Sequence, residues 1–132
     1  MSAHVDLTRI GPDDVRPDRD FQKFLREGRL MLQRSRDTGR HVFYPRVAEP
    51  VTGSLDLEWV AASGRGRVYS TTVVRQKPPS PDYNVAIIEL DEGPRLMSRV
   101  DGVAPTEVCI GMPVRAKIVD QEGVWLVVFE PA

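Results

Sequence analysis

Four residues between positions 35 and 52 have the spacing of a zinc ribbon. Ser35 and Thr38 are separated by two residues, Glu49 and Thr52 are also separated by two, and ten residues lie between the pairs. Four cysteines at this spacing would bind zinc through their thiolates. Hydroxyl groups are poor zinc ligands and one carboxylate cannot replace thiolates, so we expect no metal here. The spacing alone allows two interpretations, a ribbon that has lost its zinc or a coincidence.

The chain offers few candidates for nucleophilic or acid–base chemistry. Cys109 is the only cysteine, so a single chain forms neither a disulfide nor a thiolate zinc cluster. A reactive thiol needs a histidine or another cation beside it. Nothing in the sequence pairs His4 or His41 with Cys109, and we expect this side chain to pack. The acids of residues 89–93 (ELDEG) end a predicted strand, where solvated charge is expected, and we predict no catalytic residues.

Length and composition indicate one globular domain with room for a small appendage. The chain has 132 residues and a mass of 14.8 kDa, with 41% apolar and 28% charged residues. This composition is typical of a protein with a packed core. No apolar run approaches the roughly 20 residues that cross a bilayer, and the N-terminus lacks the pattern of a signal peptide. We therefore expect a cytoplasmic protein without membrane contact.

The net charge of −1 conceals an uneven distribution of charge. Residues 16–46 contain nine basic and four acidic residues, a net charge of +5, whereas residues 82–132 contain four basic and nine acidic residues, a net charge of −5. This asymmetry could guide docking to an anionic ligand or to an oppositely charged partner. Solvated surface charge is the alternative, and the sequence leaves both open.

The N-terminal part of the chain predicts a tail followed by a helix. Residues 1–16 are polar and show no sustained period, so we expect them to be flexible. A helix is predicted from about Asp18 to Glu27, because an aspartate can cap its start and Phe21, Phe24 and Leu25 recur at helical spacing. This apolar face must cover either the chain's own core or a partner protein.

The rest of the chain reads as β-structure. Apolar runs on either side of residues 34–40 (RSRDTGR) predict a hairpin with its turn at Gly39. Five principal strands follow Gly64, and the first is long and rich in β-branched residues. This pattern favours a small Greek-key barrel such as the OB-fold, with a sandwich as the main alternative. Gly64 and Gly66 could provide the bend or bulge that the first barrel strand needs.

Several segments, taken in order, resemble the acyl-CoA-associated DUF35 family, in which a rubredoxin-like zinc ribbon precedes a C-terminal OB-fold. The resemblance covers residues 20–131. The segments that carry it are FLREGRLMLQRS, GRHVFYPR, LEWVAASGRGRVYSTTVV, YNVAIIELDEGPRLMSRVDG and IGMPVRAKI.

The resemblance implies a mainly β fold, a five-stranded OB-fold barrel preceded by an N-terminal helix and a degenerate zinc-ribbon hairpin. We divide the chain into a flexible N-terminus (1–16), a helix with a metal-free ribbon (17–54) and an OB-fold domain (55–132). Family members carry cysteines at the four positions described above, so we expect a ribbon without zinc and no cofactor. Apolar packing must then replace the stabilisation that zinc would supply, and it would come from Leu30, Leu32, Val42, Phe43 and Tyr44.

The resemblance also implies a function, that of a non-catalytic accessory subunit in lipid, steroid or aromatic-acid metabolism. Such a subunit would bind acyl-CoA or dock on a thiolase-like enzyme or a MaoC-like hydratase, and a homo-oligomer is left open. Arg65, Arg67, Arg75 and Lys77 could bind the CoA phosphates, because odd-numbered residues of a regular strand share one face. A cationic face that only keeps the strand soluble is the alternative.

Two other functions are weighed against this one. A nucleic-acid-binding OB module needs exposed aromatic side chains in a basic groove, but Trp59, Phe43 and Phe129 read as buried, which leaves Tyr69 and Tyr83 as candidates. We therefore do not expect nucleic acid as a ligand. A stand-alone enzyme acting on an acyl-CoA would need a nucleophile or an acid–base pair, and none is recognisable.

Overall fold

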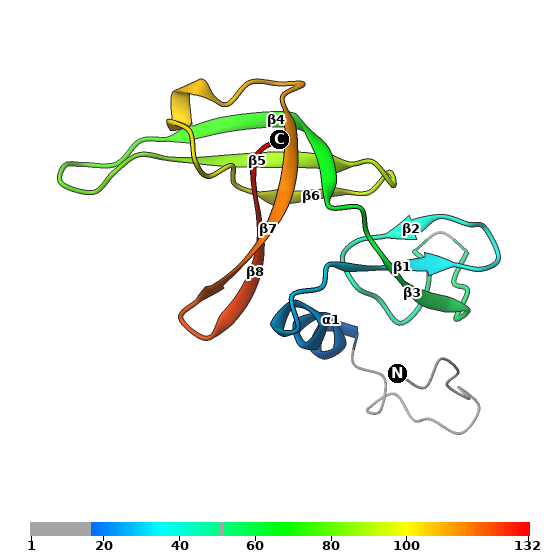
Figure 1. The fold of residues 1–132 in the computed structure, drawn as a ribbon. Helices are drawn as coiled ribbons and strands as arrows, with labels where there is room; N and C mark the ends of the chain where they lie inside the picture. Colours follow the sequence, from blue (N-terminus) through cyan, green and yellow to red (C-terminus); the bar gives the residue numbers. More distant parts are fainter. Residues whose placement is uncertain (1–16, 51) are drawn as a thin grey trace.

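The computed structural model describes residues 17–50 and 52–132, which form one α-helix, a 3-10 turn and two β-sheets. The predicted flexible N-terminus, residues 1–16, lies outside the described residues. The helix and the strands of the small sheet are α1 (Pro17–Arg26), β1 (Met31–Ser35), β2 (His41–Val42) and β3 (Leu57–Ala61). The strands of the large sheet are β4 (Arg65–Val74), β5 (Tyr83–Leu90), β6 (Arg95–Ser98), β7 (Pro113–Gln121) and β8 (Val124–Pro131). Figure 1 shows the two sheets next to each other.

Charged residues in the first and last turns stabilise α1, and a glycine ends it. Acidic residues lie in the first turn and basic residues, Lys23 and Arg26, lie in the last turn, which complements the helix dipole. Gly28 follows with a φ angle of +80°, a conformation that ends helices and suits glycine. The predicted helix is therefore confirmed, with its boundaries shifted by one residue.

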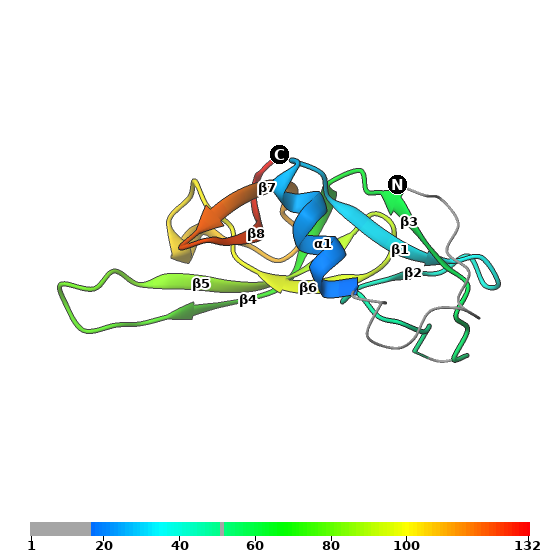
Figure 2. The same cartoon turned by 90° about the horizontal axis from the view of Figure 1, so that it is seen from below.

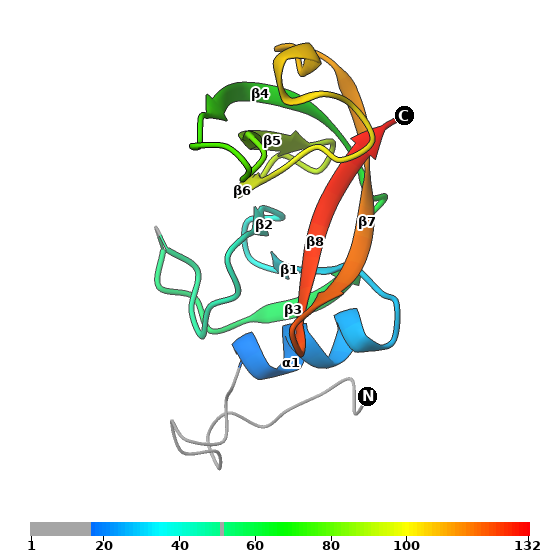
Figure 3. The same cartoon turned by 90° about the vertical axis from the view of Figure 1, so that its left-hand side faces the viewer.

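The apolar face of α1 covers the chain's own core. Phe24 and Leu25 are buried, and the Phe24 ring meets the Trp59 ring edge-on with centroids 5.2 Å apart. The Gln22 side chain donates a hydrogen bond of 2.9 Å to the Trp125 carbonyl and accepts one of 3.2 Å from the Trp125 amide. The helix therefore lies against both the small sheet and the end of the β7–β8 hairpin (Figure 3). Of the two expectations, the chain's own core is the one observed.

The small sheet contains the predicted hairpin and one strand that was expected elsewhere. Gly39, with a φ angle of +76°, forms the turn, and its amide donates a 2.8 Å hydrogen bond to the Ser35 carbonyl. The strand order is β2-β1-β3, and β3 pairs antiparallel with β1 so that Trp59 lies opposite Gln33. We expected β3 in the OB-fold domain of residues 55–132. Its backbone hydrogen bonds go to β1, so this strand belongs to the small sheet.

The large sheet has the pairing of an OB-fold. Its order is β6-β5-β4-β7-β8, so the long first strand β4 pairs with β5 on one side and with β7 on the other. The two outer strands approach each other where Val100 forms a bridge with Phe129, and the Ser98 hydroxyl donates a 2.8 Å hydrogen bond to the Val127 carbonyl. The five-strand prediction is confirmed, and one curled sheet replaces the alternative of a two-sheet sandwich.

The bulge in β4 lies later than expected. The register shifts between Val68 and Ser70, so the extra residue is Tyr69 and neither glycine. Gly66 serves another purpose, because a Cβ atom there would lie 2.5 Å from the Glu89 carbonyl oxygen. Glycine is thus needed for the close approach of β4 and β5, and Tyr69 provides the bend.

The core fills the barrel and reaches the ribbon through Leu32 and, at its edge, Phe43. Phe129 is completely buried, as predicted. Two expectations about packing were wrong. Tyr44, expected to stabilise the ribbon, is 55% exposed, and Cys109, expected to pack, is exposed with its thiol directed to the Glu107 carbonyl at 3.4 Å. Their neighbours Phe43 and Val108 take the inward positions instead.

Candidate functional site

The four positions with zinc-ribbon spacing come together in space. Ser35 ends β1, Thr38 lies in the turn to β2, and Glu49 and Thr52 flank the next turn. The Glu49 carboxylate accepts hydrogen bonds of 2.7 Å from the Thr38 hydroxyl and 2.6 Å from the Thr52 hydroxyl. The Ser35 hydroxyl oxygen accepts a 3.3 Å hydrogen bond from the Thr38 amide. We call these four residues the Glu49 cluster.

The environment of Glu49 favours the ionised carboxylate. The residue is only 3% exposed. The hydrogen bonds from Thr52 and then Thr38, with smaller effects of Ser35 and the positive charge of Arg40, hold the pKa of Glu49 below its ordinary value of 4.5. Burial acts in the opposite direction but is outweighed, because donors to a carboxylate stabilise its charged form. The cluster therefore holds a negative charge near neutral pH.

The chemistry of the Glu49 cluster suits hydrogen bonding better than metal binding. Zinc ribbons use thiolates and imidazoles, whereas this cluster offers three hydroxyl groups and one carboxylate. In residues 17–50 and 52–132, no group of three His, Cys, Asp or Glu residues is placed to hold a metal ion. What the arrangement does is join the turn after β1 to the turn before β3 through Glu49.

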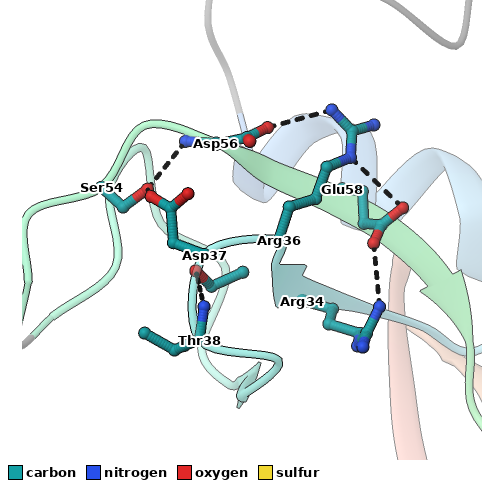
Figure 4. A network of polar contacts seen from close by, with 8 residues as sticks. Arg34, Arg36, Asp37, Thr38, Ser54, Asp56 and Glu58 are labelled. Carbon is teal, nitrogen blue, oxygen red and sulfur yellow. Dashed lines mark hydrogen bonds and ion pairs between the residues drawn. The ribbon is translucent and has the colours of Figure 1, made fainter.

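Ion pairs extend from this cluster across the outward side of the small sheet (Figure 4). Arg34 contacts Glu58 at 3.2 Å, and Arg36 contacts Asp56 at 3.0 Å and Glu58 at 3.5 Å. These pairs join β1 to β3 and to the residue just before it. Because the side chains are about a quarter to one half exposed, each pair contributes little by itself. Two of the nine basic residues predicted to make this part of the chain positive, Arg34 and Arg36, are thus paired here.

The structure does not bring the predicted phosphate-binding residues together. Arg65 and Arg67 begin β4, whereas Arg75 and Lys77 lie beyond its end, and Arg67 is about 26 Å from Arg75 along an extended strand. The bulge at Tyr69 also reverses which residue parity faces outward, so the premise of one shared face was wrong. Arg75 contacts Asp82 at 3.3 Å in the loop of the β4–β5 hairpin, which projects beyond the other strands (Figure 2). Phosphate binding by these residues stays a prediction.

An apolar groove of about 280 Å³ runs along one side of the barrel. Met97 is 62% exposed and Tyr83 is 44% exposed, which is high for large apolar side chains. The residues that line it come from β5, the end of β6 and β8, namely Tyr83, Asn84, Val85, Met97, Ser98, Arg99, Leu126 and Val128. This groove was not predicted, because only the closure of the barrel brings β8 to the side of β5 and β6. A usable signal was present in YNVAIIELD, which is apolar on both faces of a strand that should have one wet face.

The acidic residues and the histidine considered above for acid–base chemistry make contacts that are common on protein surfaces. Glu89 contacts Arg95 at 2.9 Å, and Glu92 accepts a 2.7 Å hydrogen bond from the Ser63 amide. Glu89 therefore forms a surface ion pair and Glu92 holds a turn, as expected for solvated charge. His41 lies in β2, half buried. Of the helices in the described parts of the chain, none is both long and apolar enough to cross a membrane.

Comparison with known proteins places this geometry among a set of OB-fold chains. Residues 59–119 match a family described as the C-terminal OB-fold domain of ChsH2. A DUF35 domain-containing scaffold protein of Pyrococcus furiosus is 30% identical over 98 residues, which cover 71% of this chain and 72% of that protein. The 3-oxo-4,17-pregnadiene-20-carboxyl-CoA hydratase alpha subunit of Mycobacterium tuberculosis is 35% identical over 91% of this chain. The chain spans 43% of that subunit and 29% of a probable enoyl-CoA hydratase alpha subunit of Thermomonospora curvata.

Two solved structures of DUF35 chains have a fold similar to that of this chain. A chain in the structure titled "Ltp2-ChsH2(DUF35) aldolase" is 34% identical and superposes with a TM-score of 0.77, covering 92% of this chain and 98% of that one. A DUF35 protein of Sulfolobus solfataricus, 16% identical, superposes with a TM-score of 0.66 and shows the fold alone. The superposition on the first of these neighbours thus includes both the small sheet and the barrel.

Proposed function

This chain belongs to the DUF35 family of OB-fold proteins, and we propose that it serves as a non-catalytic accessory subunit in acyl-CoA metabolism. It would dock on a thiolase-like aldolase or on a MaoC-like hydratase. One observation carries this proposal, the likeness over 98% of a solved chain whose title places it with an aldolase. The hydratase alpha subunits among the relatives add a second class of candidate partner.

The groove supports a finer proposal, that acyl-CoA binds with its apolar part against the barrel. The lining is apolar at Val85, Met97 and Leu126, which suits an acyl or pantetheine chain. Tyr83 at one end of the groove pairs with Val74, the residue before Arg75. Of the four predicted phosphate contacts, Arg75 and Lys77 are therefore the two that lie on the loop beside this end, and Arg65 and Arg67 lie at the opposite end of β4.

We further propose that the ribbon folds without zinc. The hydrogen bonds of Glu49 to Thr38 and Thr52 join the same two turns that a zinc ion would join through cysteines at these positions. Apolar packing of Leu32, Val42 and Phe43 supplies the rest. Metal analysis of protein purified without added metal tests this, and about one zinc per chain would contradict it.

Docking is tested by co-expression. The tagged chain is produced with each thiolase-like aldolase and each MaoC-like hydratase of the same organism in turn. Retention of one of them through affinity purification in stoichiometric amount is the expected result. A chain that retains none of them would count against the accessory function.

Acyl-CoA binding is tested separately by thermal unfolding. Added acyl-CoA should raise the midpoint for the wild-type chain, because a ligand that binds only the folded state stabilises it. Met97→Asp, in the groove, should lose this shift. Ile110→Asp replaces a side chain that is 72% exposed and is not among the groove residues, and it should keep the shift. Equal shifts of the unfolding midpoint in both variants would show that acyl-CoA does not bind in the groove.

A further inference from the structure

The outward side of β4 and β7 carries a stripe of basic side chains from two strands that are distant in the sequence but pair in the sheet. In β4, Gly66 and Val68 are buried, so Arg65 and Arg67 point outward and are exposed. In β7, Val114 is buried while the flanking basic residues, Arg115 and Lys117, are exposed. We call Arg65, Arg67, Arg115 and Lys117 the basic stripe.

The register brings like charges directly opposite each other. Arg65 pairs with Arg115 across the β4–β7 ladder, where neighbouring strands are about 4.8 Å apart. Arg67 lies two residues along β4, and Lys117 lies two residues along β7 in the opposite direction, each step about 7 Å. Four cations thus form a diagonal line over two strands. Like charges directly opposite each other disfavour strand pairing.

The nearby carboxylates neutralise only one residue of the stripe, Arg115. Glu130 of β8 lies opposite Arg115 and holds it with contacts of 2.7 and 3.0 Å. Glu89 of β5 lies opposite Arg67, but its carboxylate contacts Arg95 at 2.9 Å. Within residues 17–50 and 52–132, no carboxylate oxygen lies within 4.0 Å of a side-chain nitrogen of Arg65, Arg67 or Lys117. Three uncompensated positive charges therefore face solvent on one surface.

We propose that the basic stripe is a docking surface for a carboxylate-rich patch on the partner enzyme, an inference that rests on the proposed accessory function. Charge complementarity identifies the partner's chemistry, since spaced cations on exposed strands match spaced carboxylates on an opposing protein surface. A single phosphate would meet only part of a line that extends over two strands. The adjoining aromatic residue, Tyr69, is 48% exposed, and the guanidinium carbon of Arg95 lies 3.8 Å from its ring centroid. Arg95 therefore already occupies the ring and competes with the base stacking that nucleic-acid binding would require.

Charge reversal tests the surface. The Arg65→Glu, Arg67→Glu double variant should bind the co-purifying aldolase or hydratase at least about tenfold more weakly than wild type does. Arg19→Glu, Lys23→Glu makes the same charge change at exposed positions of α1 and should bind as wild type does. If the charge-reversal variant unfolds, the Arg65→Ala, Arg67→Ala double variant replaces it in the test, and it should also bind the partner more weakly than wild type does. Unchanged binding in a folded stripe variant, or equal losses in the α1 control, would overturn the inference.

Zero-length carbodiimide coupling gives a second readout, because it joins an amine to a carboxylate in contact. The sequence contains three lysines, Lys23, Lys77 and Lys117. Lys117 should couple to aspartate or glutamate of the partner, and Lys23 should not. Coupling through Lys23 with none through Lys117 would contradict the stripe as the docking surface. Normal partner binding by a stripe variant that has lost binding to acyl-CoA or an oligonucleotide would also overturn it.

The two hypotheses fail differently. If the wild-type chain retains no aldolase and no hydratase, the accessory function fails and the stripe fails with it. If wild type retains a partner and the stripe variants retain it equally well, only the stripe fails.

Discussion

The carboxylate of Glu49 lies 2.7 Å from the hydroxyl oxygen of Thr38, eleven residues earlier in the chain, in a hydrogen bond between two turns of the ribbon. Both residues are among the four positions that have zinc-ribbon spacing. A hydrogen-bonded carboxylate thus joins the two turns that carry these positions. The first two predictions follow from this contact.

The stability of the chain should depend on Glu49 at low pH. Its pKa is lowered in the folded state, so its contribution is complete above the ordinary value of 4.5 and is lost as the pH falls through the lower, folded value. Glu49→Gln should therefore lower the free energy of unfolding at pH 7 and flatten the decline on acidification. Urea unfolding between pH 7 and pH 3 measures both effects. Glu107→Gln, an exposed carboxyl, is the control, and a variant curve parallel to wild type would contradict the prediction.

Zinc binding should be recoverable. Because the four side chains of the Glu49 cluster converge, replacing all four by cysteine should give a chain with about one zinc that unfolds when a chelator is added. Metal analysis and thermal unfolding with and without chelator are the measurements. The variant with Ser35 retained is the control and should bind more weakly. A four-cysteine chain without zinc would mean that the positions do not form a ribbon site.

Much of the fold could be predicted because local patterns determine it. The helix followed from the spacing of Phe21, Phe24 and Leu25, the hairpin from Gly39, and the five strands from their β-branched runs. The assignment of β3 failed because LEWVA has the alternation of any half-buried strand, and only its pairing with β1 shows which sheet it joins. The bulge was misplaced for a related reason, since a glycine is a local signal whereas the extra residue at Tyr69 depends on two partner strands.

Gly66 should tolerate no side chain. In Gly66→Ala the new Cβ would lie 2.5 Å from the Glu89 carbonyl oxygen, which forces β4 and β5 apart and should cost about 3 kcal/mol. Gly53→Ala, with a φ angle of +72° and no atom within 4 Å, isolates the cost of backbone conformation, about 1 kcal/mol. Chemical unfolding of both variants gives the comparison. Equal losses would show that the strands separate easily at this point.

Asn84 should hold the barrel closed. Its buried side chain donates to the Val100 carbonyl and accepts from the Val100 amide, both at 2.8 Å, directly beside the bridge to Phe129. Asn84→Leu leaves both backbone groups without a partner and should cost about 2–4 kcal/mol. Ser98→Ala removes one half-buried hydrogen bond and should cost about 1 kcal/mol. Faster hydrogen exchange at Phe129 in the Asn84 variant would locate the effect, and a loss no larger than that of Ser98→Ala would argue against it.

The candidate sites were harder to predict than the fold. The spacing of the Glu49 cluster is readable because its members lie within 18 residues, at two successive turns of the chain. The groove and the basic stripe join strands that are distant in the chain, so Leu126 and Arg115 carried no signal until the barrel register placed them. The alternation of odd and even residues along β4 does not place Arg65 and Arg75 on one face, because the bulge between them reverses the alternation.

The most direct test of the accessory function is the mass of the complex in solution. The chain is co-expressed with the thiolase-like aldolases and MaoC-like hydratases of its organism, and each pair is analysed by size-exclusion chromatography with light scattering. We predict that one pair elutes as a single species whose mass requires both chains. Separate elution of the two chains in every pair, at micromolar concentration and low salt, would contradict the account.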